Sequence, residues 1–202
     1  DATLTGVNVQ FDGTLNGPHA LVVNNSGATV FNEIVGGVTP LASITTDAPG
    51  TIDIGTSAVT TSGSQTYNEL MTLLDDVTFT GVGLSFADID GDYELVADAG
   101  TGALQFNGAI GAVTPLSTLT GTGNTLAVAD ADTAGAQSYT APGGITLNGD
   151  LSGSAVTITG PVTLGSDVSI NTGSDDIVFA DPTTTINGSQ QLTLTAGTGD
   201  VF

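Results

Sequence analysis

The chain contains no lysine and no arginine among its 202 residues, whereas it contains 21 aspartate and glutamate residues, so its formal net charge is −21. Proteins bind nucleic acids and anionic lipid headgroups mainly through lysine and arginine side chains that neutralise phosphate groups. The composition therefore excludes nucleic acid and an anionic membrane surface as partners.

Cysteine is absent as well, which excludes disulfide bonds, thiolate catalysis and cysteine-ligated metal sites. No run of about 18 apolar residues is present, so we expect no membrane insertion. Neither an initiator methionine nor a cationic, hydrophobic signal segment precedes Asp1, and we expect the chain to be a mature or excised part of a longer polypeptide. A hydrophobic fraction of 39% nevertheless indicates a folded chain rather than a disordered one.

Internal repeats are the strongest signal in the sequence. Residues 1–11 resemble residues 76–86, and Val-Thr-Pro-Leu at 38–41 recurs at 113–116. A second landmark, Gly-Ser-Gln-Thr-Tyr at 63–67, returns as Gly-Ala-Gln-Ser-Tyr at 135–139. We therefore interpret the chain as a single repeat region whose units are 1–75, 76–166 and a partial unit, 167–202.

The second unit is longer than the first, and the excess centres on residues 143–161. This insert has the same alternation of short apolar runs and Gly, Asn, Asp and Ser turns as its neighbours. An insertion that copies the local pattern is what one extra coil in a solenoid would produce, so we expect an additional coil there.

Short runs in which apolar residues alternate with threonine and other polar residues recur every six to twelve residues, as at 7–11, 52–54, 145–147 and 192–194. Period-two alternation bounded by turn residues is typical of half-buried strands. We predict an all-β fold, a parallel β-solenoid of about nine coils with roughly 20 to 25 residues each. Tandem β-sandwich domains are the alternative, because the repeat length is close to that of one such domain.

Three segments also carry a resemblance to a known family: Gly-Gly-Val-Thr-Pro-Leu-Ala-Ser-Ile-Thr (36–45), Thr-Ser-Gly-Ser-Gln-Thr-Tyr-Asn (61–68) and Thr-Ala-Gly-Thr-Gly-Asp-Val-Phe (195–202). They resemble the Gly/Thr-rich repeats of giant bacterial surface adhesins of the filamentous-haemagglutinin type. The resemblance implies a right-handed parallel β-helix and a location outside the cell or on its surface.

Catalytic chemistry has few candidate groups in this chain. His19 is the only imidazole, and we interpret it as a turn or surface residue. β-Helical enzymes that act on acidic sugars hold or deprotonate their substrates with basic groups, which are missing here. A carboxylate pair could hydrolyse a glycoside, but no acidic cluster lies beside aromatic residues that would hold a sugar. We expect no enzymatic activity.

One acidic cluster, Asp88-Ile89-Asp90-Gly91-Asp92-Tyr93-Glu94, stands out. Carboxylates that alternate along a chain, with a glycine for a tight turn, are the ligands and the spacing that calcium uses. The sequence therefore suggests a calcium site made of Asp88, Asp90, Asp92 and Glu94, against the alternative of a solvated turn. Weaker candidates are the pairs Asp130/Asp132 and Asp175/Asp176.

The sequence thus predicts a non-enzymatic structural segment of an extracellular fibre or adhesin, a stiff acidic rod whose partner is itself. Such a rod would stack end to end into a filament or continue into a longer polypeptide. The alternative is a calcium-dependent adhesin that binds a glycan or matrix ligand.

Overall fold

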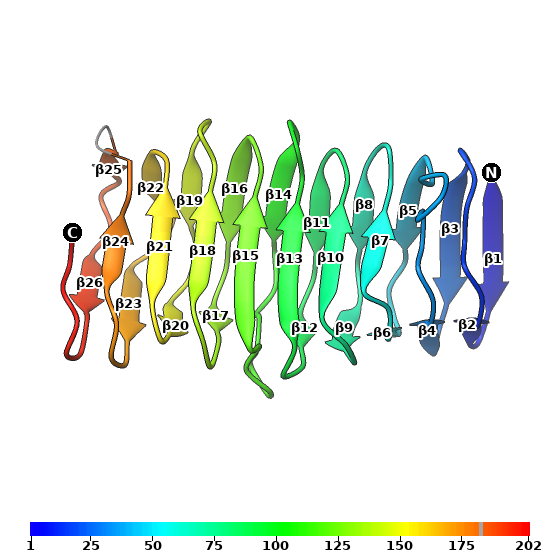
Figure 1. Ribbon diagram of the computed structural model, residues 1–202, viewed down its shortest axis with the longest axis horizontal. Coiled ribbons are helices and arrows are strands. Elements are labelled where there is room, and N and C mark those ends of the chain that lie inside the picture. Colours follow the sequence, from blue (N-terminus) through cyan, green and yellow to red (C-terminus); the bar gives the residue numbers. More distant parts are fainter. Residues whose placement is uncertain (182–183) are drawn as a thin grey trace.

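The structure is a computed structural model that describes residues 1–181 and 184–202, and in this part of the chain it is a parallel β-solenoid without helices (Figure 1). The all-β solenoid predicted from the sequence is confirmed. The tandem-sandwich alternative is wrong, because every strand pair in the described residues is parallel. Short strands alternate with tight turns, so each coil returns to the sheet it left and pairs with the coil before it.

Three faces, named here in chain order, enclose the core. The first face is one ten-stranded sheet to which each coil contributes a strand. Its strands are β1 (Ala2–Gly6), β3 (Ala20–Asn25), β5 (Ser43–Thr46), β8 (Gln65–Tyr67), β11 (Leu84–Phe86), β14 (Ala103–Phe106), β16 (Thr125–Val128), β19 (Ile145–Leu147), β22 (Val162–Leu164) and β25 (Ile186–Asn187).

The second face consists of a five-stranded and a four-stranded sheet, which isolated bridges from Ile110 to Ile89 and Ala131 join into one surface. The five strands are β2 (Val9–Phe11), β4 (Ala28–Phe31), β6 (Thr51–Ile54), β9 (Leu70–Leu73) and β12 (Ile89–Asp90). The other four are β17 (Ala131–Asp132), β20 (Leu151–Gly153), β23 (Val168–Thr172) and β26 (Leu192–Thr195).

The third face is a seven-stranded sheet, extended toward the N-terminus by bridges that link Leu15, Val35 and Val59. Its strands are β7 (Ala58–Thr60), β10 (Val77–Thr80), β13 (Glu94–Asp98), β15 (Thr118–Thr122), β18 (Gln137–Thr140), β21 (Val156–Thr159) and β24 (Ile177–Phe179).

The coils lie on average at the short end of the predicted length, so there are ten of them in the described residues rather than nine. Ile145 pairs with Val162, only 17 residues further along the chain, whereas Val162 pairs with Ile186, 24 residues further along. The short coils turn within very few residues, as at Gly144, whose positive φ of 127° permits the turn into β19.

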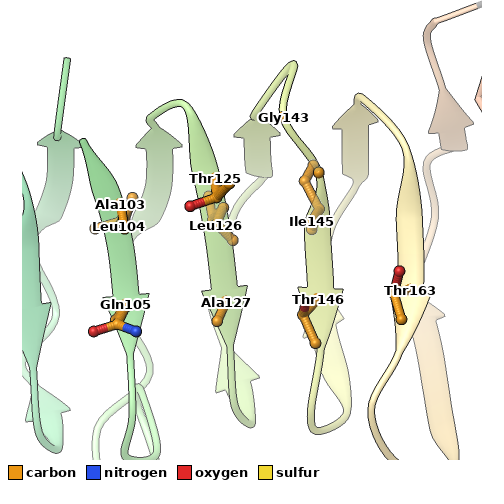
Figure 2. Close-up of a pocket in the computed structure, with 11 residues that line it drawn as sticks. Ala103, Leu104, Gln105, Thr125, Leu126, Ala127, Gly143, Ile145, Thr146 and Thr163 are labelled. Atoms are coloured by element: carbon orange, nitrogen blue, oxygen red, sulfur yellow. The ribbon is translucent and has the colours of Figure 1, made fainter. Parts of the chain in front are cut away.

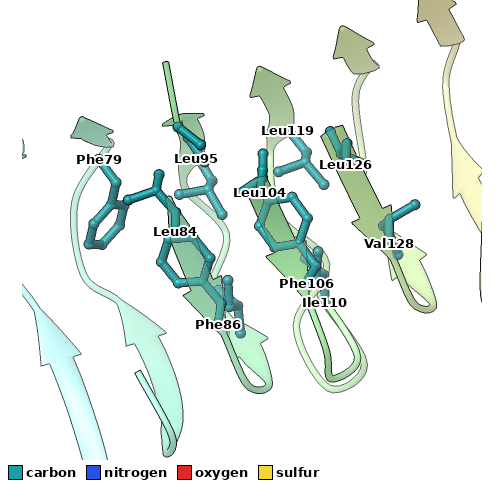
Figure 3. Close-up of a cluster of buried hydrophobic side chains, with 14 of the residues drawn as sticks. Phe79, Leu84, Phe86, Leu95, Leu104, Phe106, Ile110, Leu119, Leu126 and Val128 are labelled. Atoms are coloured by element: carbon teal, nitrogen blue, oxygen red, sulfur yellow. The ribbon is translucent and has the colours of Figure 1, made fainter. Parts of the chain in front are cut away.

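Alternate residues of each strand point inward and stack on their counterparts in the next coil, as Figure 3 shows for the central coils. Aromatic rings form the best-defined stack. Phe86 lies 5.4 Å from Tyr67 on one side and 5.5 Å from Phe106 on the other, ring centre to ring centre, in stacked geometry. Phe79 meets Phe86 edge to face from the third face, at 5.1 Å. The core is therefore one continuous apolar column along the solenoid axis.

Successive sequence repeats do not begin on the same face of the solenoid. The segment that opens the first unit forms β1 on the first face, whereas the matching segment at 76–86 begins with β10 on the third face. The third unit opens with β23 on the second face. Each unit thus contains a non-integral number of coils, and equivalent residues of two units face different directions. Residues 143–161, where the sequence predicts an additional coil, contain β19, β20 and β21, one strand on each face.

A buried polar network shows that the repeated motifs keep their structure despite this rotation. Gln65 Nε2 donates to Thr80 O at 2.9 Å, and Tyr67 Oη donates to Gln65 Oε1 at 2.8 Å. In the second unit, Gln137 Nε2 donates to Ser152 O at 2.7 Å and Tyr139 Oη donates to Gln137 Oε1 at 3.0 Å. Burial raises the pKa of both tyrosines far above its ordinary value. The same motif therefore builds the same network on the first face and on the third.

Candidate functional site

The acidic segment proposed as a calcium site spans a corner of the solenoid. Asp88 and Asp90 flank the buried Ile89 on the second face, and Gly91, with a φ of 132°, turns the chain toward the third face. Asp92 is exposed in this turn, and Glu94 opens β13 on the third face. The corner thus separates Glu94 from the two aspartates, and no group of three or more carboxylate or histidine side chains with metal-binding geometry occurs among the described residues.

Asp88 and Asp90 already have partners in the next coil. Asp88 Oδ1 accepts a hydrogen bond from the backbone N–H of Ala109 at 2.8 Å. Asp90 Oδ1 accepts from the N–H groups of Val113 at 2.9 Å and Thr114 at 3.2 Å. Each carboxylate retains its second oxygen, and calcium binding by Asp88, Asp90, Asp92 and Glu94 stays a prediction.

Many other acids make the same kind of contact, which explains how a chain without basic residues accommodates them. A carboxylate at a corner accepts a hydrogen bond from a backbone N–H of an adjacent coil, 18 to 24 residues away in sequence. Such charge-assisted bonds satisfy N–H groups that the ladders leave free. The acceptors and donors are Asp1 and Ala20, Asp47 and Asn25, Asp76 and Glu94, Asp130 and Asp150, Asp150 and Ser169, Asp167 and Gln191, and Asp176 and Asp200.

One aspartate of each weaker candidate pair accepts a backbone hydrogen bond of this kind. Asp130 and Asp132 flank Ala131, with Asp132 in β17 of the second face, and Asp130 is one of the acceptors just described. Asp175 and Asp176 precede β24, where Asp176 accepts from the N–H of Asp200 at 2.8 Å. His19 lies at a turn, where its backbone N–H donates to the carbonyl of Gly17 at 2.8 Å.

Glu69 is the carboxylate whose environment sequence reasoning missed. Its side chain is only 3% exposed, and neither carboxylate oxygen has a hydrogen-bond partner. It lies under the turn at residues 47–50 of the preceding coil, where Oε1 is 2.6 Å from the position that a Cβ on Gly50 would occupy. Burial, and to a lesser degree the Asp47 carboxylate, raise the pKa of Glu69 to about 7. No lysine or arginine exists to compensate its charge.

Glu69 reads in the sequence as an ordinary surface acid between Asn68 and Leu70. Its burial depends on a turn about 20 residues earlier, which only the coil register brings over it. Glu69 is thus a single buried carboxyl whose pKa is raised to about 7, and one carboxyl alone does not make a metal site.

Shallow hollows occur on the outer surfaces of the faces. One of about 310 Å³ lies on the first face and is lined by residues of β14, β16, β19 and β22, including Gln105, Ala127 and Thr146 (Figure 2). Another, of about 230 Å³, lies on the second face beside Asp130, Asp132 and Asp150. The hollow on the first face has no acidic residue in its lining, whereas the hollow on the second face has three.

No protein-family model, no curated protein sequence and no solved structure matches this chain. The described residues contain no helix long and apolar enough to cross a membrane.

Proposed function

We propose that this chain is a non-enzymatic structural segment of an extracellular surface fibre or adhesin, in which it forms a stiff, acidic rod. The observation that carries the proposal is the unbroken ladder of the first face, where all ten strands pair in sequence from β1 to β25. Bending the rod would break backbone hydrogen bonds and the side-chain stacks beneath them in the same place. At a strand spacing of about 4.8 Å, ten coils extend for roughly 43 Å.

End-to-end contact between copies, or continuation into further coils of a longer polypeptide, is part of this proposal. The strands of a terminal coil leave one row of backbone N–H and C=O groups without a neighbour, which favours pairing with another coil. Half-buried apolar side chains lie at both ends: Leu4 and Phe11 in the first coil, Leu192 and Leu194 in the last. A further coil stacked on either end would cover them.

The net charge of −21 opposes such stacking between separate copies. Salt screens this repulsion, since the Debye length falls from about 10 Å at 0.1 M to about 3 Å at 1 M. We therefore expect electron micrographs to show isolated rods at low salt and longer fibres at high salt. Monodisperse monomers by light scattering at high protein and salt concentration would refute the stacking, and a globular particle by small-angle X-ray scattering would refute the rod.

A calcium-dependent adhesin is the second candidate. It is supported by the free oxygens of Asp88 and Asp90 next to the exposed Asp92, at a corner from which a loop with the exposed Val113 projects one coil further on. Calcium bound there would order the corner, and a glycan or matrix ligand would be held beside it. This candidate predicts a calcium-dependent change in stability, which the rod alone does not require.

A further inference from the structure

The acids of this chain are distributed unequally over the three faces. None of the ten strands of the first face contains aspartate or glutamate. The second face has Asp53, Asp90 and Asp132 in its strands, and the third face has Glu94 and Asp98. The first face is therefore an uncharged strip on a molecule whose net charge is −21.

Two pairs of equivalent strands from the two sequence units illustrate this difference between the faces. Strands β3 and β13 are equivalent in the two repeats, yet β3 on the first face has Ala20 and Asn24 where β13 on the third face has Glu94 and Asp98. Strand β6 on the second face reads Thr-Ile-Asp-Ile, whereas its equivalent β16 on the first face reads Thr-Leu-Ala-Val. In both pairs the strand on the first face has a small or amide residue where its equivalent has an acid.

The outer surface of this strip is hollowed along the solenoid axis. The hollow of about 310 Å³ in Figure 2 shares Ala103 and Gln105 with a second hollow of about 200 Å³ that extends to β8. The two hollows adjoin at these residues, and their lining extends from β8 to β22 across the strands; we refer to them together as the groove. The outward side chains that follow one another in register along it are Thr66, Ser85, Gln105, Ala127, Thr146 and Thr163.

The chemistry of this groove selects its ligand. Its hydroxyl and amide groups donate and accept hydrogen bonds but carry no charge, and the small Ala127 leaves room beside them. The negative field of the whole molecule repels polyanions, and a polycation would bind to the two acid-bearing faces instead. A neutral chain rich in hydroxyl groups that runs along the axis meets one outward side chain about every 4.8 Å, the strand spacing, and five of the six are polar, the exception being Ala127.

We propose that the groove on the first face binds an extended segment of an uncharged polysaccharide, laid along the solenoid axis. The proposal deepens the second candidate function, glycan adhesion, but moves the binding site away from the Asp88 to Glu94 corner and makes binding independent of calcium. Polysaccharide binding and the structural role of the rod are independent, since a chain that binds no polysaccharide could still form the rod.

The test uses affinity electrophoresis of the full chain in native gels that contain hydroxyethyl cellulose, dextran or glucomannan, with the polyanion alginate as a comparison. We expect at least one neutral polysaccharide to retard the protein, with and without a calcium chelator, and alginate to have no effect. A Thr146→Glu variant, which places a carboxylate in the groove, should weaken that retardation at least about fivefold, because the ligand would have to bury an unpaired charge.

Thr157→Glu is the matched control. Thr157 is an outward-facing threonine of β21 on the third face, outside the groove, and the change in charge is identical. It should bind like the unmodified chain, and circular dichroism should show both variants folded. The proposal is overturned if none of the neutral polysaccharides retards the protein, if alginate retards it equally, or if the two variants lose binding alike. It is also overturned if Thr146→Glu abolishes only self-association measured by light scattering, which would make the groove an interface between copies.

Discussion

Replacement of Glu69 by glutamine should stabilise the protein above neutral pH and leave its stability unchanged in acid. Glu69 is only 3% exposed, and both of its carboxylate oxygens lack hydrogen-bond partners. In the unfolded chain its pKa is 4.5, whereas burial and the Asp47 carboxylate raise it to about 7 in the fold. The folded state therefore favours the protonated form.

The sign of the pH dependence follows from this difference. Well below pH 4.5 the carboxyl is neutral in both states and costs the fold nothing. As the pH rises from 4.5 to about 7, the unfolded chain loses this proton while the folded chain must keep it or bury a charge, so stability falls over this range and levels off above it. A change in pKa from 4.5 to about 7 corresponds to about 3 kcal/mol at most. Because only one turn covers the group and water can partly screen its charge, we expect a loss of about 2 kcal/mol between pH 4.5 and 8.

Thermal melting followed by circular dichroism at pH 4 and pH 8 measures this effect. For a domain of this size about 2 kcal/mol corresponds to a difference of roughly 4 to 8 °C in Tm. Glu69→Gln should raise Tm at pH 8 by that amount and change it little at pH 4. Glu33→Gln removes a charge from an exposed glutamate and serves as the control. Equal gains for both variants at pH 8 would mean that relief of net charge, not burial, is responsible, and would refute the assignment.

Three further predictions concern the core, a corner and calcium. Phe86→Ala should destabilise the fold by about 3 to 5 kcal/mol in urea unfolding, because its ring stacks on both neighbouring coils. Phe11→Ala in the half-exposed first coil should destabilise the fold clearly less. Equal losses of stability in the two variants would contradict the continuous column. Gly111→Ala should lower the urea midpoint, since Gly111 has a φ of 70° and a Cβ would collide with the backbone carbonyl of Asp132, whereas Gly13→Ala, with nothing within 4 Å, should not. If calcium binds at the corner, millimolar calcium should raise Tm for the native chain but not for Asp92→Asn, and an unchanged Tm with calcium or chelator would dismiss the site.

The sequence was sufficient to predict the strands, because a half-buried strand repeats apolar residues with period two on any face of a solenoid. It underestimated the number of coils, since it did not reveal how few residues a corner needs. The turn at Gly91 takes the chain from Asp90 on the second face to Glu94 on the third within four residues. The same corner explains why carboxylates close in sequence do not gather on one face.

The face on which each repeat lies could not be predicted from the sequence. All three faces impose the same alternation, so the segments at 1–11 and 76–86 look interchangeable although they begin on the first and the third face. The burial of Glu69 was hidden for a related reason, because it depends on which turn of the neighbouring coil lies above it. Contacts between coils are set by the lengths of whole coils, and no local pattern records that register.

Comparison of the two repeats also distinguishes the hydrogen bonds that an aspartate makes at a corner from the effect of its charge. Asn16 in the first unit occupies the position of Asp90 in the second, and its Oδ1 accepts from the N–H groups of Val38 at 2.8 Å and Thr39 at 3.2 Å. Asp90 binds the equivalent pair, Val113 and Thr114, with nearly the same distances. The backbone therefore requires an acceptor oxygen at this corner but not a charge.

Asp90→Asn should consequently leave the urea midpoint almost unchanged, because the amide oxygen can accept both hydrogen bonds as Asn16 does. Asp90→Ala should destabilise the protein by about 1 to 2 kcal/mol, since two backbone N–H groups lose their partner. Asn16→Ala should cost a similar amount, and Asn16→Asp should again be close to neutral. A large loss in Asp90→Asn would show that the charge itself stabilises the corner. The absence of lysine and arginine would then require a bound cation or another compensating interaction there.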